Sequence, residues 1–160
     1  MSAIEQPITV TLEQESDFAF RIIFDHDGWA PLLADEPSPL GHDRGPNPSR
    51  LLLASVLNCL SASLLFALRK YKNSPGTLRA TITATPLRNP EGRWRIPRAF
   101  VEIQLPEGNE HYQQLDRVLE QFEGFCIVTQ SVRQGIEVEV TVKDAHGHVV
   151  LGDKSFEAGA

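Results

Sequence analysis

The longest apolar run of the chain is NPSRLLLASVLNCLSASLLFALRKY, residues 47–71. Asparagine is a favoured helix N-cap, and proline fits the first helical position because the amide it lacks would have no partner there. Asn47 and Pro48 therefore predict the start of a helix. The sequence Asn-Ser-Pro-Gly at residues 73–76 cannot continue a helix, so we predict that it ends at about Tyr71.

This predicted helix is apolar on nearly all sides, which is typical of a buried central helix or of a membrane span. Asn58 near its middle and the charged, strand-rich flanks argue against a lipid-facing segment, and we expect no membrane association. A soluble domain surrounds such a helix only with a large sheet or a second subunit. We therefore expect a homodimer with this helix at the interface. The polar residues between positions 51 and 68 are Ser55, Asn58, Ser61 and Ser63.

Apolar and polar residues alternate in several segments before and after the helix, as in half-buried strands. We predict strands at residues 8–13, 18–24, 29–33, 78–85, 101–105 and 136–142. Helical spacing of apolar residues predicts a second helix over 109–122, and residues 126–134 fit one or two helical turns. With neither repeats nor a linker, residues 1–160 are predicted to form a single α+β domain. Its core spans about 8–143, and residues 144–160 form a possible hairpin and a polar tail.

Composition limits the classes of function. The 160 residues carry a net charge of −6, which repels phosphate backbones and anionic membranes. Four arginines surround Trp94, but alternation along a strand with charges facing water explains them equally well, so we predict no nucleic-acid binding. The first seven residues lack a basic segment followed by an apolar run, so we expect no secretory signal and a cytoplasmic protein.

Cys59 and Cys126 are the two cysteines of the chain. A permanent disulfide is disfavoured where thiols are kept reduced, and two cysteines alone cannot complete a tetrahedral zinc site. Two inert buried thiols or a redox pair remain. Ser55 and Ser63 lie four residues either side of Cys59 on one helix face. Cys126 precedes a predicted helix, whose amides and dipole would lower the pKa of its thiol. If the two thiols meet, one can form a sulfenic acid and the other can resolve it as a disulfide.

Other residue clusters predict no cofactor or metal. The Asp-Ala-His-Gly-His run at 144–148 offers two imidazoles and a carboxylate, but its glycine and its place in a probable turn favour a solvated loop. The sequence contains no glycine-rich phosphate loop, and no Ser-His-Asp order can be assigned.

The segment Gly45 to Cys59, with its loop, cap, helix and cysteine in register, resembles the OsmC/Ohr family of osmotically inducible and organic-hydroperoxide-resistance proteins. A second similar segment is Cys126-Ile-Val-Thr-Gln-Ser-Val132 with the alternating residues 136–142 after it. The resemblance covers roughly residues 8–143. It implies antiparallel strands wrapped around long central helices in an intertwined homodimer, with active sites at the subunit interface.

The resemblance also implies a peroxiredoxin-like thiol peroxidase of the oxidative stress response. Cys59 would attack an organic hydroperoxide, Cys126 would resolve the product, and a small dithiol would reduce the pair. An arginine from an early strand would hold the thiolate; Arg21 is the candidate, with Arg50 as an alternative.

The sequence departs from the family pattern at two positions. The family's glutamate, ten residues before the first cysteine, is replaced by Ser49, and the proline after the second cysteine is replaced by Ile127. The rival hypothesis is a non-catalytic dimer that binds a small apolar or thiol-reactive ligand at the interface. Ser49 favours this rival, whereas both cysteines favour the enzyme.

Overall fold

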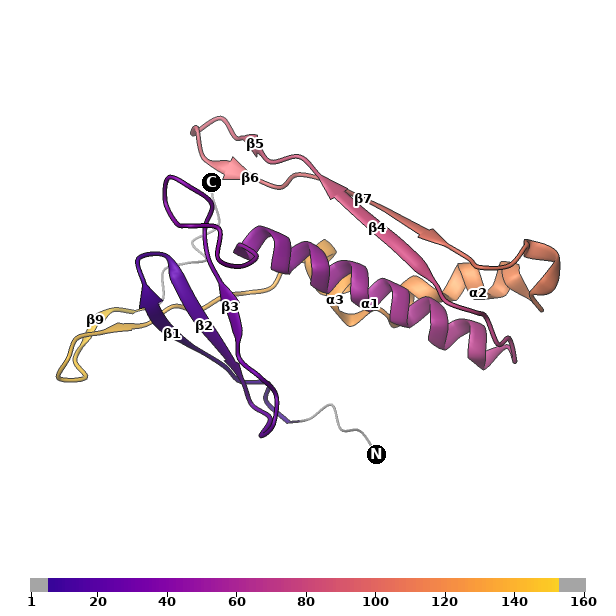
Figure 1. Cartoon of the computed structure of the whole chain (residues 1–160), viewed down its shortest axis with the longest axis horizontal. Coiled ribbons are helices and arrows are strands. Elements are labelled where there is room, and N and C mark those ends of the chain that lie inside the picture. The colour runs from indigo at the N-terminus through magenta and orange to yellow at the C-terminus, as the bar shows by residue number, and fades with distance from the viewer. Residues whose placement is uncertain (1–5, 153–160) are drawn as a thin grey trace.

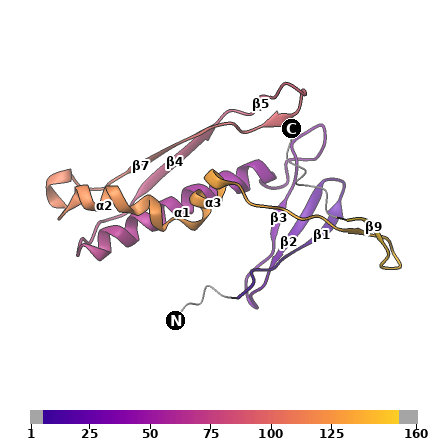
Figure 2. The ribbon, with the colours of Figure 1, turned by 180° about the vertical axis from the view of Figure 1, so that it is seen from behind.

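A computed structural model describes residues 6–152 of the chain. A long helix, α1, lies at its centre, with the strands β4 and β7 along one side and the helices α2 and α3 along another (Figures 1 and 2). The molecule is therefore a mixed α/β structure with antiparallel sheets. The strands are β1 (Val10–Ser16), β2 (Ala19–Phe24), β3 (Leu32–Ala34), β4 (Arg79–Ala84), β5 (Leu87–Arg88), β6 (Trp94–Arg95), β7 (Ala99–Gln104), β8 (Val142–Lys143) and β9 (Val149–Leu151). The helices are α1 (Pro48–Lys70), α2 (Leu115–Gln121) and α3 (Ile127–Gln134), with 3-10 turns η1 (Asn109–His111) and η2 (Phe122–Phe125).

Helix α1 begins and ends where the sequence predicts. The Asn47 side chain accepts a hydrogen bond from the Arg50 amide at 3.1 Å, and Pro48 is the first helical residue. At the other end, the amide of the cap residue Tyr71 donates to the Ala67 carbonyl at 3.2 Å. Within the described residues, α1 is the one helix long and apolar enough to cross a membrane, a criterion that core helices of soluble proteins also meet.

The sheets are small and antiparallel. Strands β1, β2 and β3 form a three-stranded sheet beyond the N-terminal end of α1 (Figure 1). Strands β4 and β7 pair over their full length, from Arg79 opposite Gln104 to Ala84 opposite Ala99, and pack on α1. Hairpins β5–β6 and β8–β9 complete the described strands.

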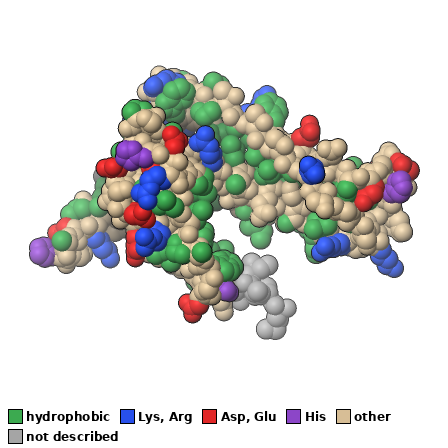
Figure 3. Space-filling model, viewed as in Figure 1, with side chains coloured by type: hydrophobic (Ala, Val, Ile, Leu, Met, Phe, Trp, Pro, Cys, Tyr) green, Lys and Arg blue, Asp and Glu red, His purple; other side chains and the backbone are tan. Residues whose placement is uncertain are grey.

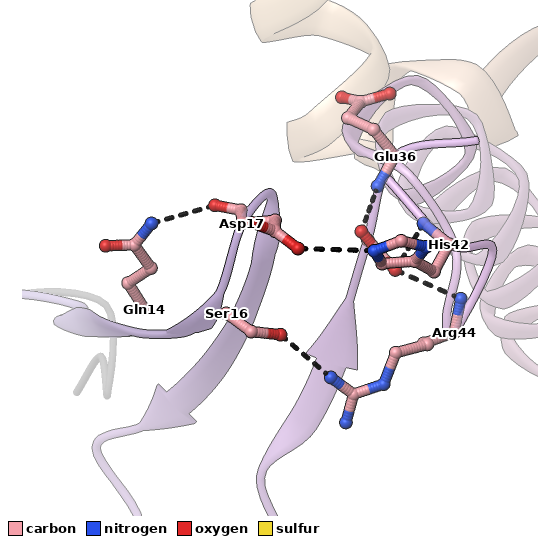
Figure 4. Close-up of polar contacts among 7 residues, drawn as sticks. Gln14, Ser16, Asp17, Glu36, His42 and Arg44 are labelled. Carbon is pink, nitrogen blue, oxygen red and sulfur yellow. Dashed lines mark hydrogen bonds and ion pairs between the residues drawn. The ribbon is translucent and has the colours of Figure 1, made fainter. Parts of the chain in front are cut away.

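The loop between β3 and α1 is held by the buried carboxylate of Asp35. It accepts hydrogen bonds from the backbone amides of Glu36 at 2.8 Å, His42 at 3.1 Å and Arg44 at 3.2 Å (Figure 4). The loop also reaches the β1–β2 hairpin, because His42 Nε2 lies 3.2 Å from an Asp17 carboxylate oxygen. The hydrogen bonds of Asp35 and the contact between His42 and Asp17 therefore hold the loop in the position from which it leads into α1.

The core consists of two clusters on successive turns of α1. In one, Leu64, Ala67 and Leu68 pack with Val118 of α2. The other contains Val56 and Leu60 of α1 together with Cys126, and Cys59 packs against it.

Three predicted elements differ from the structure. The predicted helix over 109–122 is interrupted, because Gln114 adopts a left-handed backbone conformation (φ 51°) and α2 starts only after it. The third strand is shorter than predicted and begins after Pro31, which has no amide to donate to a ladder. The predicted strand over 136–142 is wrong except for its last residue, because only Val142 lies in a described strand, β8. Alternation gives the period of a strand but does not determine which segment pairs with it. The hairpin predicted after residue 143 is present as β8–β9, whereas the predicted tail at 153–160 lies outside the described residues.

Much apolar surface remains uncovered in the single chain. Its accessible surface is 12628 Å², whereas a compact monomer of this mass exposes roughly 8,000 Å². Hydrophobic side chains extend over much of the face seen in Figure 3. Helix α1 itself has six buried residues among its 23: Val56, Leu60, Ser63, Leu64, Ala67 and Leu68.

Candidate active site

Helices α1 and α3 bring the two cysteines together although 67 residues separate them in sequence. Cys59 lies near the middle of α1, and Cys126 is the N-cap of α3. Both are free thiols, and their sulfurs lie within hydrogen-bonding reach of each other. Cys126 is fully buried, whereas Cys59 is partly exposed. A substrate can therefore reach the pair only through Cys59.

The first turn of α3 directs its polar groups at both sulfurs. The Thr129 amide donates to Cys126 Sγ at 3.4 Å, and the Thr129 hydroxyl oxygen lies 3.1 Å from the same sulfur. The Val128 amide lowers the pKa of Cys59, and the Ser63 hydroxyl, one helical turn after Cys59, lowers the pKa of both thiols. These donors and the helix dipole favour negative charge on the pair.

The two thiols respond differently to this environment. Burial raises the pKa of the Cys59 thiol, and contact with Cys126 raises it further. Burial also disfavours the Cys126 thiolate, but the hydrogen bonds from Cys59 and then Thr129 outweigh this, so the pKa of Cys126 is lowered. The first proton to leave the pair therefore leaves a thiolate on Cys126 that is hydrogen-bonded by the Cys59 thiol.

A mostly apolar groove of about 780 Å³ runs along α1; Arg98, Glu123 and Arg133 also line it, and the two cysteines are not part of its lining. Residues of α1, β7, α2 and α3 line it, and Thr129 belongs both to the groove and to the surroundings of Cys126. Such a groove suits an apolar ligand. Its lining includes Val56, Leu60, Val101, Ile103, Leu119 and Thr129.

Neither candidate arginine lies at the cysteines within one chain. Arg21 of β2 is instead paired with Glu15 of β1, with 3.2 Å between Arg21 Nη2 and a carboxylate oxygen. Arg50 stands in the first turn of α1, nine residues before Cys59, which is about 14 Å along a helix axis. Its side chain is exposed.

The sequence analysis missed the carboxylate that holds Arg21. Glu15 also pairs with Arg44 of the loop before α1, at 2.5 Å, and Arg44 donates to the Ser16 hydroxyl at 3.2 Å (Figure 4). These interactions lower the pKa of Glu15. The β1–β2 register puts Glu13 opposite Arg21, and Glu15 lies at the irregularity of the ladder between Gln14 and Ser16. The sequence alone carries no signal for this pairing, because it does not determine the register of β1 and β2.

The histidine-rich turn is a hairpin connection. His148 Nδ1 lies 3.2 Å from an Asp144 carboxylate oxygen in the turn between β8 and β9. Within residues 6–152, no group of three or more histidine, cysteine or acidic side chains is arranged to hold a metal ion. In the arginine-rich hairpin, the Arg88 guanidinium stacks on Trp94, 4.5 Å from the ring centre.

Comparison with known proteins gives a consistent family. Residues 41–141 match the family of OsmC-like proteins. An OsmC-like protein from Mycoplasma pneumoniae has a similar structure, with a TM-score of 0.64, 17% identity, and coverage of 83% of this chain and 91% of that one. No curated protein sequence matches the chain.

Two organic hydroperoxide resistance proteins also share the fold. The protein of Elizabethkingia anophelis gives a TM-score of 0.63 with 18% identity, covering 86% of this chain and 95% of the other. That of Bacillus subtilis gives 0.59 with 16% identity, covering 83% and 95%. At such identities the likeness concerns the fold.

Proposed function

The chain belongs to the OsmC-like protein family, and from that premise we propose that it is a thiol-dependent peroxidase that reduces organic hydroperoxides through Cys59 and Cys126. The observation that carries the proposal is the contact between two free thiols at the N-terminus of α3, one buried and one partly exposed. The family and its hydroperoxide resistance members support this substrate class. Family members are soluble, and we propose that this protein acts in the cytoplasm.

The proposed reaction begins with the shared proton moving from Cys59 to Cys126. The Cys59 thiolate attacks the outer oxygen of the hydroperoxide, an S–O bond forms, and the O–O bond breaks. Cys59 becomes a sulfenic acid, and the departing alkoxide takes the proton from the Cys126 thiol. The Cys126 thiolate then attacks the Cys59 sulfur, forming the disulfide and releasing hydroxide. A small dithiol returns two electrons by thiol–disulfide exchange.

Burial supports Cys59 as the attacking residue and Cys126 as the resolving one. Cys126 is completely inaccessible, so a peroxide cannot reach it first. Its packing beside Cys59 supports the proposed attack of Cys126 on the sulfenic acid. The mostly apolar groove along α1 is suited to the organic part of the substrate.

We further propose that the active protein is a homodimer. The single chain exposes on the order of 4,000–5,000 Å² more surface than a compact monomer of its mass, which exceeds the roughly 1,000–2,500 Å² that each subunit of an obligate dimer commonly buries. The exposed apolar side chains include Phe66 of α1 and Ile127 of α3, on the two helices that carry the cysteines.

In such a dimer, the arginine at the thiolate is proposed to come from the partner subunit. Arg21 lies outside the cysteine site of its own chain, but Glu15 already orients it, which compensates for Ser49 in place of the family's glutamate. An arginine held by a carboxylate is well suited to stabilise a thiolate or a departing alkoxide.

The test is peroxide consumption by reduced protein with cumene hydroperoxide and a dithiol. Wild type should turn over, whereas Cys59→Ser should be inactive and Cys126→Ser should react once and stop. Wild-type activity no greater than that of Cys59→Ser, with no loss of free thiols, would contradict the proposal.

Because of this groove, a non-catalytic protein that binds a small apolar ligand is the alternative to this proposal. Apolar ligands should bind it in both cases, because it does not depend on thiol chemistry. Binding of an apolar fluorescent probe to wild type and Cys59→Ser alike, without peroxide consumption by wild type, would favour a binding protein.

A further inference from the structure

Two buried hydroxyl groups surround the cysteine pair, and the proposed reaction assigns them no part. Ser63 projects from α1 one turn after Cys59, and Thr129 lies in the first turn of α3. Their residues are 6% and 5% exposed. An aliphatic side chain is the usual occupant of such core positions, because burying a hydroxyl group costs free energy unless it is hydrogen-bonded.

We propose that Thr129 and Ser63 are positioning residues that hold the Cys126 sulfur and stabilise its thiolate, the form that the resolving step requires. The inference deepens the proposed function, on which its catalytic meaning rests. Thr129 acts directly, since its hydroxyl oxygen lies 3.1 Å and its amide nitrogen 3.4 Å from Cys126 Sγ. A hydroxyl group can accept a hydrogen bond from a protonated thiol and donate one to a thiolate, so the Thr129 hydroxyl can bind either form of Cys126.

Ser63 completes the arrangement from the opposite helix. Its hydroxyl group lowers the pKa of both thiols. The remaining surroundings of the pair are apolar: Val56 and Leu60 of α1, Ile82 and Ile103 of the β4–β7 sheet, Phe122, and Val128 of α3. Burial has the largest influence on the pKa of either thiol, and the other thiol and these neutral hydroxyl and amide groups come next. Within one chain, the hydroxyl groups of Ser63 and Thr129 are therefore among the groups that favour a thiolate on Cys126.

The arrangement explains why a fully buried cysteine can take part in the chemistry. The proton of the Cys126 thiol can be given to the departing alkoxide. Giving up that proton leaves Cys126 as the thiolate that must attack next. Without the hydroxyl groups, burial would favour two neutral thiols, and neither step would have its charged reactant.

The experiment measures thiolate formation in the reduced protein by its ultraviolet absorbance and by the pH dependence of alkylation with iodoacetamide. Peroxide is absent from both measurements. Wild type should lose one proton below the ordinary thiol range and the second above it, as expected for a coupled pair. Thr129→Val keeps the size and the amide but removes the hydroxyl group, and should lower the thiolate fraction at neutral pH by about tenfold. Ser63→Ala should act in the same direction.

Thr129→Ser is the matched control, because it keeps the hydroxyl group and should restore the wild-type titration. A titration of Thr129→Val that coincides with that of wild type would overturn the inference, whatever the peroxidase activity. A Thr129→Ser titration that instead follows Thr129→Val would also overturn it, since packing rather than the hydroxyl would then be responsible. If the titrations agree with expectation but wild type consumes no peroxide, the proposed function fails and the inference about the Cys126 thiolate stands.

Discussion

Replacing Gly45 with alanine is expected to destabilise the protein, because the backbone of β3 passes directly over this glycine. A Cβ at Gly45 would lie 2.1 Å from the Leu33 carbonyl oxygen and 2.9 Å from its carbonyl carbon. Both neighbours belong to the main chain of a paired strand, so no side-chain rotation can relieve the overlap. The loop and β3 would have to separate by about 1 Å, displacing the loop that leads into α1.

The magnitude follows from the cost of overpacking. Forcing extra atoms into a packed region costs about 1–3 kcal/mol, and a backbone obstacle belongs at the upper end of that range. We therefore expect Gly45→Ala to lose about 2–3 kcal/mol of unfolding free energy. In a chain of this length, each kcal/mol shifts Tm by about 2–4 °C, so Tm should fall by about 4–12 °C.

The assay is thermal unfolding followed by circular dichroism at one protein concentration. Gly124→Ala is the matched control, because nothing lies within 4 Å of a Cβ at that position. Its Tm should stay the same or rise slightly, since alanine reduces the entropy of the unfolded chain. Equal Tm values for the two variants would refute the steric argument.

Other perturbations address the core, the loop and the arginine. Leu68→Ala removes a fully buried side chain and should cost about 2–5 kcal/mol in urea unfolding; a cost near zero would contradict the assigned core. Although burial raises the pKa of Asp35, three amide hydrogen bonds lower it overall. The stabilisation that the ionised Asp35 carboxylate gives the folded protein is therefore complete above its unfolded-state pKa of about 3.9. It is lost as the pH falls through the lower pKa of Asp35 in the folded protein. Asp35→Asn should be less stable than wild type at neutral pH, with a gap that narrows below about pH 4 in denaturation curves; a gap independent of pH would contradict this. Arg21→Ala should slow peroxide consumption by at least about tenfold and Glu15→Gln by less, whereas equal rates in all three proteins would exclude the pair from the site.

Local signals made the central helix predictable. The Asn47 cap and Pro48 act within one turn, and the stop after Tyr71 depends on neighbouring residues, so the sequence contains all the information needed for α1. The same holds for the position of Cys126 before α3, which its N-cap geometry confirms. The contact between Cys59 and Cys126 is tertiary, and the sequence left it open.

Other features depended on interactions that a single sequence does not display. The left-handed backbone conformation at residue 114 shortens the second helix. It could not be predicted, because residue 114 is a glutamine and not one of the residue types that favour this conformation, such as glycine or asparagine. The alternation over 136–142 specifies which side chains share a face but not which strand lies beside them. The pairing of Arg21 with Glu15 depends on the register of β1 and β2, which the sequence left undetermined.

The central claim, that Cys59 and Cys126 form a redox pair in which Cys59 reacts first, is tested most directly by identifying the oxidised sulfur. Reduced protein would be treated with one equivalent of cumene hydroperoxide and a sulfenic-acid trap, then digested for mass spectrometry. We predict an intrachain Cys59–Cys126 disulfide in wild type and a trapped sulfenic acid on Cys59 in Cys126→Ser. A trapped sulfenic acid on Cys126 in Cys59→Ser, or wild-type thiols that remain reduced, would contradict the account.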